Sequence, residues 1–155
     1  MLIYIKRLFV FIWFLIGLIT FSHTQCGFQP ITLYINGIEQ EMSINHELNG
    51  PSVIVLKLIN ESKTKGCSYK FGKILIGGNG GFQNYSKAIE PPGDFSTQGA
   101  IAKIVIDSRL YQELKNRKKI NQLELVIWEV WQKDESGKIS RWIRWDDGRY
   151  SFRLN

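Results

Sequence analysis

Two tryptophan–arginine pairs in the C-terminal third are the side chains best suited to contact a partner. Trp131 and Arg141 form one pair, and Trp145 and Arg149 form the other. A guanidinium stacked on an indole gains about 0.5–1 kcal/mol at an exposed site, and Trp and Arg dominate the binding energy of protein interfaces. We therefore predict a partner-binding surface made of these four residues. A ladder that only protects a sheet surface and a stacking site for a sugar ring are the alternatives.

The residues that catalysis or metal binding would need are sparse. His46 is the one histidine outside the N-terminal segment, and no ligands surround it at metal-binding spacing. We predict that His46 lies in a surface loop. Aspartates such as Asp107 and Asp134 stand beside expected caps and turns, where Asp is favoured for backbone reasons. We therefore expect no metal, no cofactor and no catalysis, with a carbohydrate-active or hydrolytic enzyme as the rival class.

Neither of two features that could hold phosphate groups meets the requirements for doing so. The glycine-rich run 77–81 lacks the Lys and Ser/Thr of a phosphate loop, and no helical pattern follows it. We predict a turn between strands there. The formal net charge is +6, and its densest run, residues 115–119, is typical of a solvated helix end. A nucleic-acid partner is not expected, because the excess charge is modest and not gathered on one stripe.

Three expected strands position the tryptophan–arginine pairs. These segments, at residues 123–133, 139–145 and 149–154, are rich in aromatic and β-branched residues. Short turns that end in Gly137 and Gly148 separate them. The short turns predict that the three strands form an antiparallel meander.

The register of this meander follows from its turns. If Asp134 pairs with Lys138, and Trp145 with Arg149, both tryptophan–arginine pairs share one face. The opposite face is then the predicted core, because a slip of one residue would expose all of it. It comprises Val126, Trp128, Val130, Trp142, Tyr150, Phe152 and Leu154.

The remaining elements are mostly strands, so the predicted fold is an all-β, Ig-like, two-sheet antiparallel β-sandwich. Asn36-Gly37 is the strongest short hairpin signal in the chain. One short helix is expected at residues 109–118, with Asp107 or Ser108 as its cap. The other expected strands are residues 31–35, 38–44, 52–60, 69–76 and 100–106.

The N-terminus has the parts of a secretory signal peptide. Lys6 and Arg7 precede an apolar run at residues 8–19, which Ser22 and the next residues end. The run is shorter than the about 20 residues that span a bilayer comfortably. We therefore expect a signal peptide at residues 1–24, with a retained anchor as the alternative, and one exported domain at 25–155. Its location would be periplasmic or extracellular.

The chain has two cysteines, Cys26 and Cys67, and both would be exported. An oxidising compartment permits a disulfide between them, while two separate residues, one at a frayed terminus and one in a loop, are the alternative. Lipidation of Cys26 is a third option. Membrane contact is expected only through the N-terminal segment or such a lipid.

Residues 69–155 contain a set of features that match a known family: the passage 104–108, the helix with Leu110, Leu114 and Lys115 and its basic exit, a strand ending near Glu129-Val130, the turn 134–138 and the alternation 150–154. In these features they resemble in part the C-terminal periplasmic domain of the gliding-motility and type IX secretion protein M family of Bacteroidota. The resemblance implies an Ig-like sandwich that works by protein–protein contact in the envelope, without cofactor or catalysis. This chain departs from the family in being one short domain and in having Ile120-Asn121-Gln122 where the family has Gly-Asp.

These observations together predict an exported, non-catalytic binding or assembly module with an unknown protein partner in the envelope. A carbohydrate-binding or carbohydrate-active domain is one alternative. A small secreted inhibitor or immunity protein is the other, and it would present a rigid loop such as residues 82–98 to its target.

Overall fold

The computed structural model describes most of the chain that follows the predicted signal peptide. The predicted signal peptide at residues 1–24 lies outside the described residues, which begin at Cys26. Trp145 also lies outside them. The residues described are 26–27, 29–41, 45–60, 66–78, 81–83, 88–90, 93–116, 122–143 and 148–155.

The first sheet is antiparallel and has four strands in the order β2-β1-β4-β8. Between β1 and β2, Asn36 and Gly37 both have positive φ, 50° and 82°, as the turn predicted from Asn-Gly requires. Strand β2 is shorter than the expected 38–44. The bounds are β1 (Ile31–Ile35), β2 (Ile38–Glu39), β4 (Ser52–Ile59) and β8 (Gly99–Ile106).

The second sheet has five strands in the order β3-β12-β9-β6-β7. Gly78 pairs with Gly81 across β6 and β7, which confirms that the glycine-rich run joins two strands. The bounds are β3 (Asn45–Leu48), β6 (Ile74–Gly78), β7 (Gly81–Gln83), β9 (Gln122–Ile127) and β12 (Arg149–Leu154).

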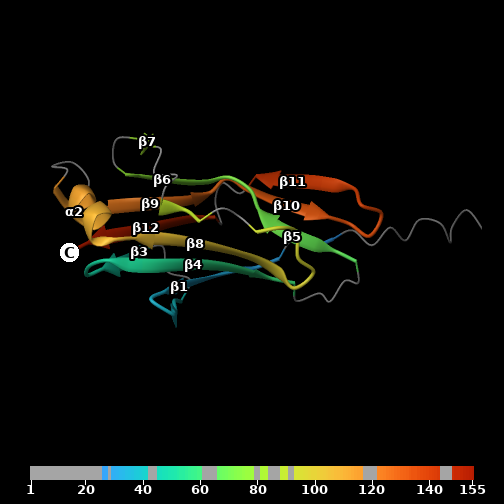
Figure 1. The fold of residues 1–155 in the computed structure, drawn as a ribbon, viewed down its shortest axis with the longest axis horizontal. Coiled ribbons are helices and arrows are strands. Elements are labelled where there is room, and N and C mark those ends of the chain that lie inside the picture. The colour runs from blue at the N-terminus through green and yellow to red at the C-terminus, as the bar shows by residue number, and fades with distance from the viewer. Residues whose placement is uncertain are drawn as a thin grey trace, which may run out of the picture.

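A three-stranded sheet, β11-β10-β5, extends the second sheet. Its strands are β5 (Ser68–Phe71), β10 (Glu129–Lys133) and β11 (Ile139–Ile143). The junction is hydrogen-bonded, because the Gly72 N–H donates to Glu129 O at 2.9 Å and the Trp128 N–H to Lys73 O at 2.8 Å. β5, β10 and β11 lie at the end of the molecule opposite the helix and the C-terminus (Figure 1).

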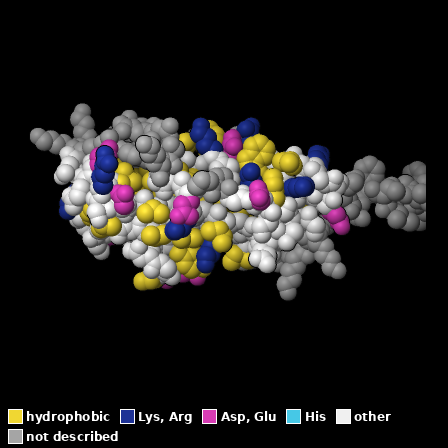
Figure 2. All heavy atoms as spheres, viewed as in Figure 1, with side chains coloured by type: hydrophobic (Ala, Val, Ile, Leu, Met, Phe, Trp, Pro, Cys, Tyr) yellow, Lys and Arg dark blue, Asp and Glu magenta, His cyan; other side chains and the backbone are white. Residues whose placement is uncertain are grey.

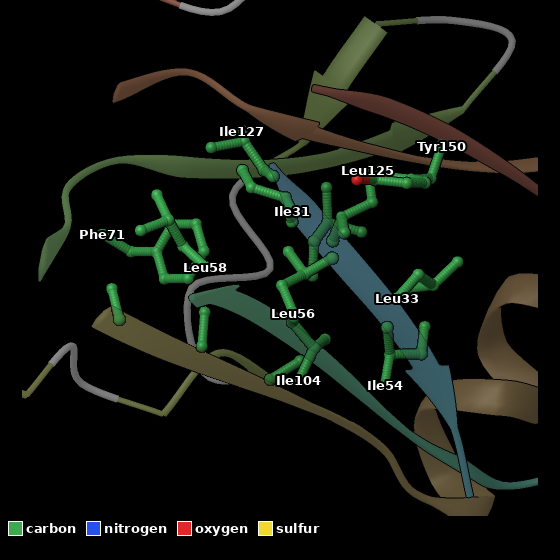
Figure 3. Packing of buried hydrophobic residues seen from close by; sticks show 14 of the residues in the cluster. Ile31, Leu33, Ile54, Leu56, Leu58, Phe71, Ile104, Leu125, Ile127 and Tyr150 are labelled. Carbon is green, nitrogen blue, oxygen red and sulfur yellow. The ribbon is translucent and has the colours of Figure 1, made fainter. Parts of the chain in front are cut away.

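The two main sheets pack on each other and confirm the all-β sandwich. Ile54, Leu56 and Ile104 from the first sheet and Leu125 and Ile127 from the second are completely buried, and their side chains meet between the sheets (Figure 3). The orders β1-β4-β8 and β6-β9-β12 correspond to the A-B-E and C-F-G strands of an immunoglobulin-like domain.

The predicted C-terminal meander is wrong in its third strand. β11 pairs with β10 as expected, but β12 pairs with β9 and β3 instead of with β11. The reason is a break at Trp128, where two successive N–H groups, of Trp128 and Glu129, both donate to Lys73 O. β9 and β10 therefore belong to different sheets, and β11 and β12 run in the same direction along this interrupted strand.

The break also changes which side chains face the core. The alternation that places Val126 and Trp128 in the core would put Ile127 on the outer face. Ile127 is instead completely buried, and Trp128 is only half-buried. Val130, Tyr150 and Phe152 are buried as predicted. Tyr150 and Phe152 reach the core because β12 lies beside β9, where they stand opposite Leu125 and Leu123.

One strand pair departs from the antiparallel prediction. β3 pairs with β12 in parallel, with His46 beside Phe152. His46 is therefore buried, with 6% of its surface exposed, and its ring centroid lies 5.5 Å from that of Phe152. The prediction that His46 lies in a surface loop was wrong, because the alternation of residues 45–48 is too short to mark a strand by itself.

The expected helix is present as α2 (Ser108–Asn116). Asp107 caps it, since the Leu110 N–H donates to Asp107 Oδ1 at 2.7 Å. Tyr111 and Leu114 are the residues that α2 buries. Within the described part of the chain, no helix has the length and apolar character that crossing a bilayer requires.

Candidate partner-binding surface

We call the three-stranded sheet β11-β10-β5 the extension sheet. Its register aligns four side chains in one row. Trp131 lies opposite Arg141 on one side and opposite Lys70 on the other. An isolated bridge between Tyr69 and Ser96 continues the sheet by one more segment, and antiparallel pairing then places Phe95 opposite Lys70. We call Phe95, Lys70, Trp131 and Arg141 the cation–aromatic ladder.

Cations and rings alternate along this ladder and contact one another. The Arg141 Cζ lies 5.8 Å from the centroid of the Trp131 ring. The Lys70 Nζ lies 5.5 Å from the centroid of the Phe95 ring. Both distances are within the about 6 Å over which a ring attracts a cation. The predicted stacking of Arg141 on Trp131 is thus confirmed, and Lys70 and Phe95 extend it.

Glu129 fixes the guanidinium of Arg141. The Arg141 Nη1 donates to Glu129 Oε1 at 3.1 Å. The Arg141 side chain is 49% exposed and that of Glu129 is 16% exposed. The ion pair is therefore partly shielded from water, and it orients the guanidinium against the indole.

Gly72 provides the space in which Trp131 lies. A Cβ at position 72 would stand 2.4 Å from Trp131 Nε1 and 2.6 Å from Cδ1. No real Cβ approaches other atoms this closely, so the indole lies directly on the glycine backbone. Trp131 is half-buried as a result, and its position is set by the sheet beneath it.

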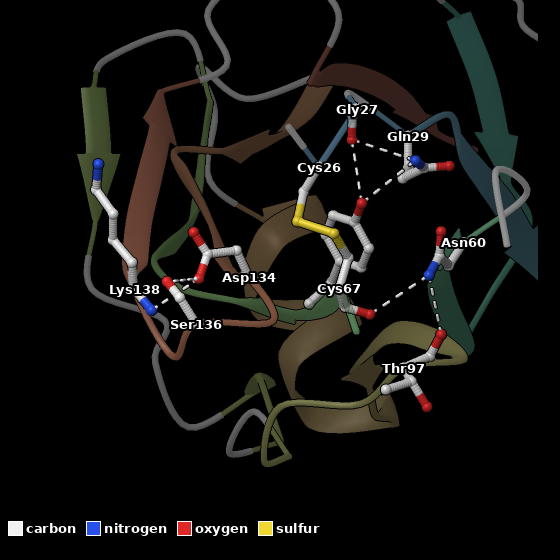
Figure 4. Close-up of a disulfide and its surroundings, with 10 residues drawn as sticks. Cys26, Gly27, Gln29, Asn60, Cys67, Thr97, Asp134, Ser136 and Lys138 are labelled. Atoms are coloured by element: carbon white, nitrogen blue, oxygen red, sulfur yellow. Dashed lines mark hydrogen bonds between the residues drawn. A yellow bond between two sulfur atoms is a disulfide. The ribbon is translucent and has the colours of Figure 1, made fainter. Parts of the chain in front are cut away.

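The turn between β10 and β11 is held by Asp134. Its carboxylate Oδ1 accepts hydrogen bonds from Ser136 Oγ at 2.6 Å and from the Lys138 N–H at 2.9 Å, as Figure 4 shows. The hydrogen bond from Ser136 is the main reason why the pKa of Asp134 lies below its usual value. The hairpin that presents Trp131 and Arg141 is thereby fixed at its tip.

A disulfide between Cys26 and Cys67 fixes the other side of the extension (Figure 4). Their Cα atoms are 5.8 Å apart, and both residues are buried. A sulfur in a disulfide cannot also carry a thioether-linked lipid, so lipidation of Cys26 is incompatible with the bridged form. The bridge fits an oxidising, exported compartment.

Tyr69 and Gln29 pack beside the bridge. Burial raises the pKa of the Tyr69 phenol, which donates to Gly27 O at 3.2 Å. The Gln29 Nε2 donates to the Tyr69 hydroxyl at 3.3 Å. These contacts attach the first described residues of the chain to β5.

The four predicted site residues are not all brought together. Trp131 and Arg141 are adjacent, and Trp145 lies outside the described residues. Arg149 is exposed on β12, where it stands opposite Val126. The proposed pairing of Trp145 with Arg149 therefore falls outside the described residues; Arg149 itself pairs with β9.

A groove opens beside the ladder at Lys70. Its volume is about 360 Å³, and its apolar lining includes Leu58, Ile59, Phe71 and Ile101. Ile59 and Ile101 are 46% and 62% exposed. An apolar side chain of a partner could enter this groove while another part of the partner contacts the ladder.

The described residues offer little else for chemistry or recognition. They contain no cluster of His, Cys, Asp or Glu able to hold a metal ion. Within the loop 82–98, Ile89 bridges to Ile104 and Ser96 to Tyr69, so these positions lie against the body rather than project from it. On the face that Figure 2 shows, cationic and anionic side chains are intermixed and form no single-sign stripe.

Comparison with known proteins identifies no relative, because no family model, curated protein or solved structure matches this chain. Nothing in these comparisons links it to the gliding-motility and type IX secretion family, and that resemblance stays a prediction.

Proposed function

We propose that this chain is an exported, non-catalytic binding module that captures a protein partner in the cell envelope through the cation–aromatic ladder. The observation that carries the proposal is the seating of Trp131 on Gly72 beneath Arg141. Trp and Arg are the residues that most often dominate interface energies. Here their positions are set before any partner arrives, which lowers the entropy cost of binding.

The surroundings of the ladder support this proposal. The hairpin is fixed at its tip by Asp134, and the Cys26–Cys67 bridge fixes the base of β5. The groove beside Lys70 supplies an apolar pocket next to charged and aromatic groups. Interfaces commonly combine such a pocket with a polar rim.

Export is the second element of the proposal. Lys6 and Arg7 followed by an apolar run are typical of a signal peptide, and structural disulfides persist in oxidising compartments. Expression of the full chain in its producing cells, with fractionation and N-terminal sequencing of the product, tests this element. Recovery of the intact, uncut chain from the cytoplasm would contradict it.

The binding proposal is tested by capture from envelope extracts. The full chain is immobilised as wild type, Trp131→Ala and Arg141→Ala, and bound proteins are quantified by mass spectrometry. A specific partner should be lost by about tenfold or more in both variants. Arg153→Ala is the matched control, because Arg153 is exposed on β12 in the other sheet.

Two outcomes would overturn the proposal. Equal capture by wild type, Trp131→Ala and Arg141→Ala would show that the ladder only protects the sheet surface. Retention of the wild type on immobilised polysaccharide, lost in Trp131→Ala, would identify the ladder as a sugar-stacking site instead. Arg149→Ala in the same series shows whether Arg149 belongs to the surface despite its place on β12.

A further inference from the structure

β11 forms an edge of the extension sheet. The sheet order β11-β10-β5 gives β11 one neighbour among the described strands. The Asp134 N–H donates to Lys138 O at 3.0 Å, so this pair is hydrogen-bonded, and the pairs alternate from there along an antiparallel ladder. The main-chain groups of Ser140 and Trp142 therefore face β10, whereas those of Ile139, Arg141 and Ile143 face outward.

The outward-facing edge coincides with the end of the cation–aromatic ladder. Arg141 is the last member of the row, and its side chain is 49% exposed. A strand added beside β11 would place one of its side chains next to Arg141 on the same face. Ile139, which is 50% exposed, lies two residues away on that face.

Cationic side chains lie near this edge. Lys133 and Lys138 are exposed near the turn. Two of the nearby carboxylates are engaged, since Glu129 bonds Arg141 and Asp134 bonds Ser136 and the Lys138 N–H. A third, Glu135, lies beside Gly66, which precedes β5 on the other side of β10. A guanidinium has five N–H donors, so Arg141 can bind a second carboxylate in addition to Glu129.

We propose that the partner binds by adding an extended, acidic segment to the edge of β11, with one carboxylate beside Arg141. This inference rests on the proposed binding function and names the chemistry of its partner. The main-chain groups of Ile139, Arg141 and Ile143 supply the hydrogen bonds, and Arg141 supplies the selection for acidic residues. Strand addition of this kind derives affinity from the backbone and specificity from side chains.

A second copy of this chain fits the edge less well. Antiparallel pairing of two β11 strands about Arg141 would bring two Arg141 side chains together, and like charges directly opposite each other are destabilising. An acidic segment avoids this repulsion.

The test uses the full-length wild-type chain and three synthetic peptides that alternate Thr with one other residue. The first peptide carries Glu, the second carries Lys, and the third carries Glu with N-methyl groups at alternate backbone positions. Dissociation constants are measured by fluorescence anisotropy. The unmodified Glu peptide should bind about tenfold more tightly than the other two, and Arg141→Glu should reverse the preference between Glu and Lys.

Hydrogen exchange locates the peptide. The amides of Ile139 and Arg141 should exchange more slowly in the complex with the Glu peptide, while Lys103→Ala, on the exposed face of β8, should leave the affinity unchanged. Equal binding of all three peptides, or unchanged exchange at both amides, would overturn the edge proposal. If Trp131→Ala still abolishes partner capture in that case, the proposed binding function stands without it. If the peptides bind as expected but Trp131→Ala does not reduce capture, the proposed function fails instead.

Discussion

The sandwich body, which consists of the two main sheets, and the extension sheet β11-β10-β5 are stabilised by different interactions. In the body, the interior is aliphatic and aromatic, and residues such as Ile54, Leu125 and Phe152 have no exposed surface. In the extension, β5 and β10 bury Phe71 and Val130 on one face, while the other face carries the cation–aromatic ladder at partial exposure. A disulfide and a carboxylate-bonded turn hold this region. Burial therefore stabilises the body, and specific local contacts shape the extension.

The largest loss of unfolding free energy should come from removing a large side chain from the core of the sandwich body. Phe152→Ala removes a completely buried ring, and such truncations cost about 3–5 kcal/mol of unfolding free energy. Urea unfolding followed by circular dichroism measures this change. Arg153→Ala, one residue further along β12, should stay within about 0.5 kcal/mol of the wild type. Similar values for both variants would show that β12 does not seal the core.

Removing the disulfide should cause the next largest loss of stability. This loss should be greater in the extension sheet than in the sandwich body. The double substitution Cys26→Ser with Cys67→Ser releases a constraint across a sequence separation of 41 and should cost about 2–4 kcal/mol. Hydrogen exchange should accelerate more in β5 than in β4. Equal acceleration in both strands would remove the distinction between extension and body.

A smaller effect is expected from filling the space beneath Trp131. Gly72→Ala forces the indole away from a Cβ that would lie 2.4 Å from its Nε1, and overpacking of this kind costs about 1–3 kcal/mol. Partner capture should fall although every ladder residue is retained. Tryptophan fluorescence reports the displacement. Gly93→Ala is the control for stability and fluorescence, because nothing lies within 4 Å of a Cβ there. An unshifted spectrum for Gly72→Ala would contradict the seating of Trp131.

The smallest effect concerns the turn and depends on pH. Because the pKa of Asp134 is lowered from 3.8 in the folded chain, mainly by the Ser136 hydroxyl, the charged carboxylate stabilises the hairpin at pH values above 3.8. That contribution is lost as the pH falls through the folded pKa. Asp134→Asn should therefore speed amide exchange in the hairpin at neutral pH and differ little from the wild type in acid. A difference that does not change with pH would exclude this role for the charge.

The local elements of the body were predictable from the sequence. Asn36-Gly37 predicted a turn because both positions require positive φ, which they have. The apolar run at 52–60 predicted β4, and Asp107 predicted the helix cap. The pairing of β9 with β12 was not predictable, because the four successive apolar residues at 125–128 fit either face of a strand and so hide the one-residue shift at Trp128.

The candidate site was half predictable for the same reason. Trp131 and Arg141 are joined by a short turn, so the sequence separation alone gave their register. Lys70 and Phe95 come from distant segments, and their positions depend on the pairing of β5 with β10 and with Ser96. Gly72 was predicted as an ordinary strand residue, since only the three-dimensional structure shows an indole lying on it.

The position of β12 has a consequence for the order in which the molecule can assemble. β3 and β9 are not neighbours; β12 lies between them, although it follows both in the chain. While a nascent chain is being synthesised, the facing edges of β3 and β9 must therefore wait, open to solvent, until Arg149–Leu154 has emerged. The second sheet can therefore be completed only after the last strand has been synthesised, even though β6 and β9 can pair earlier.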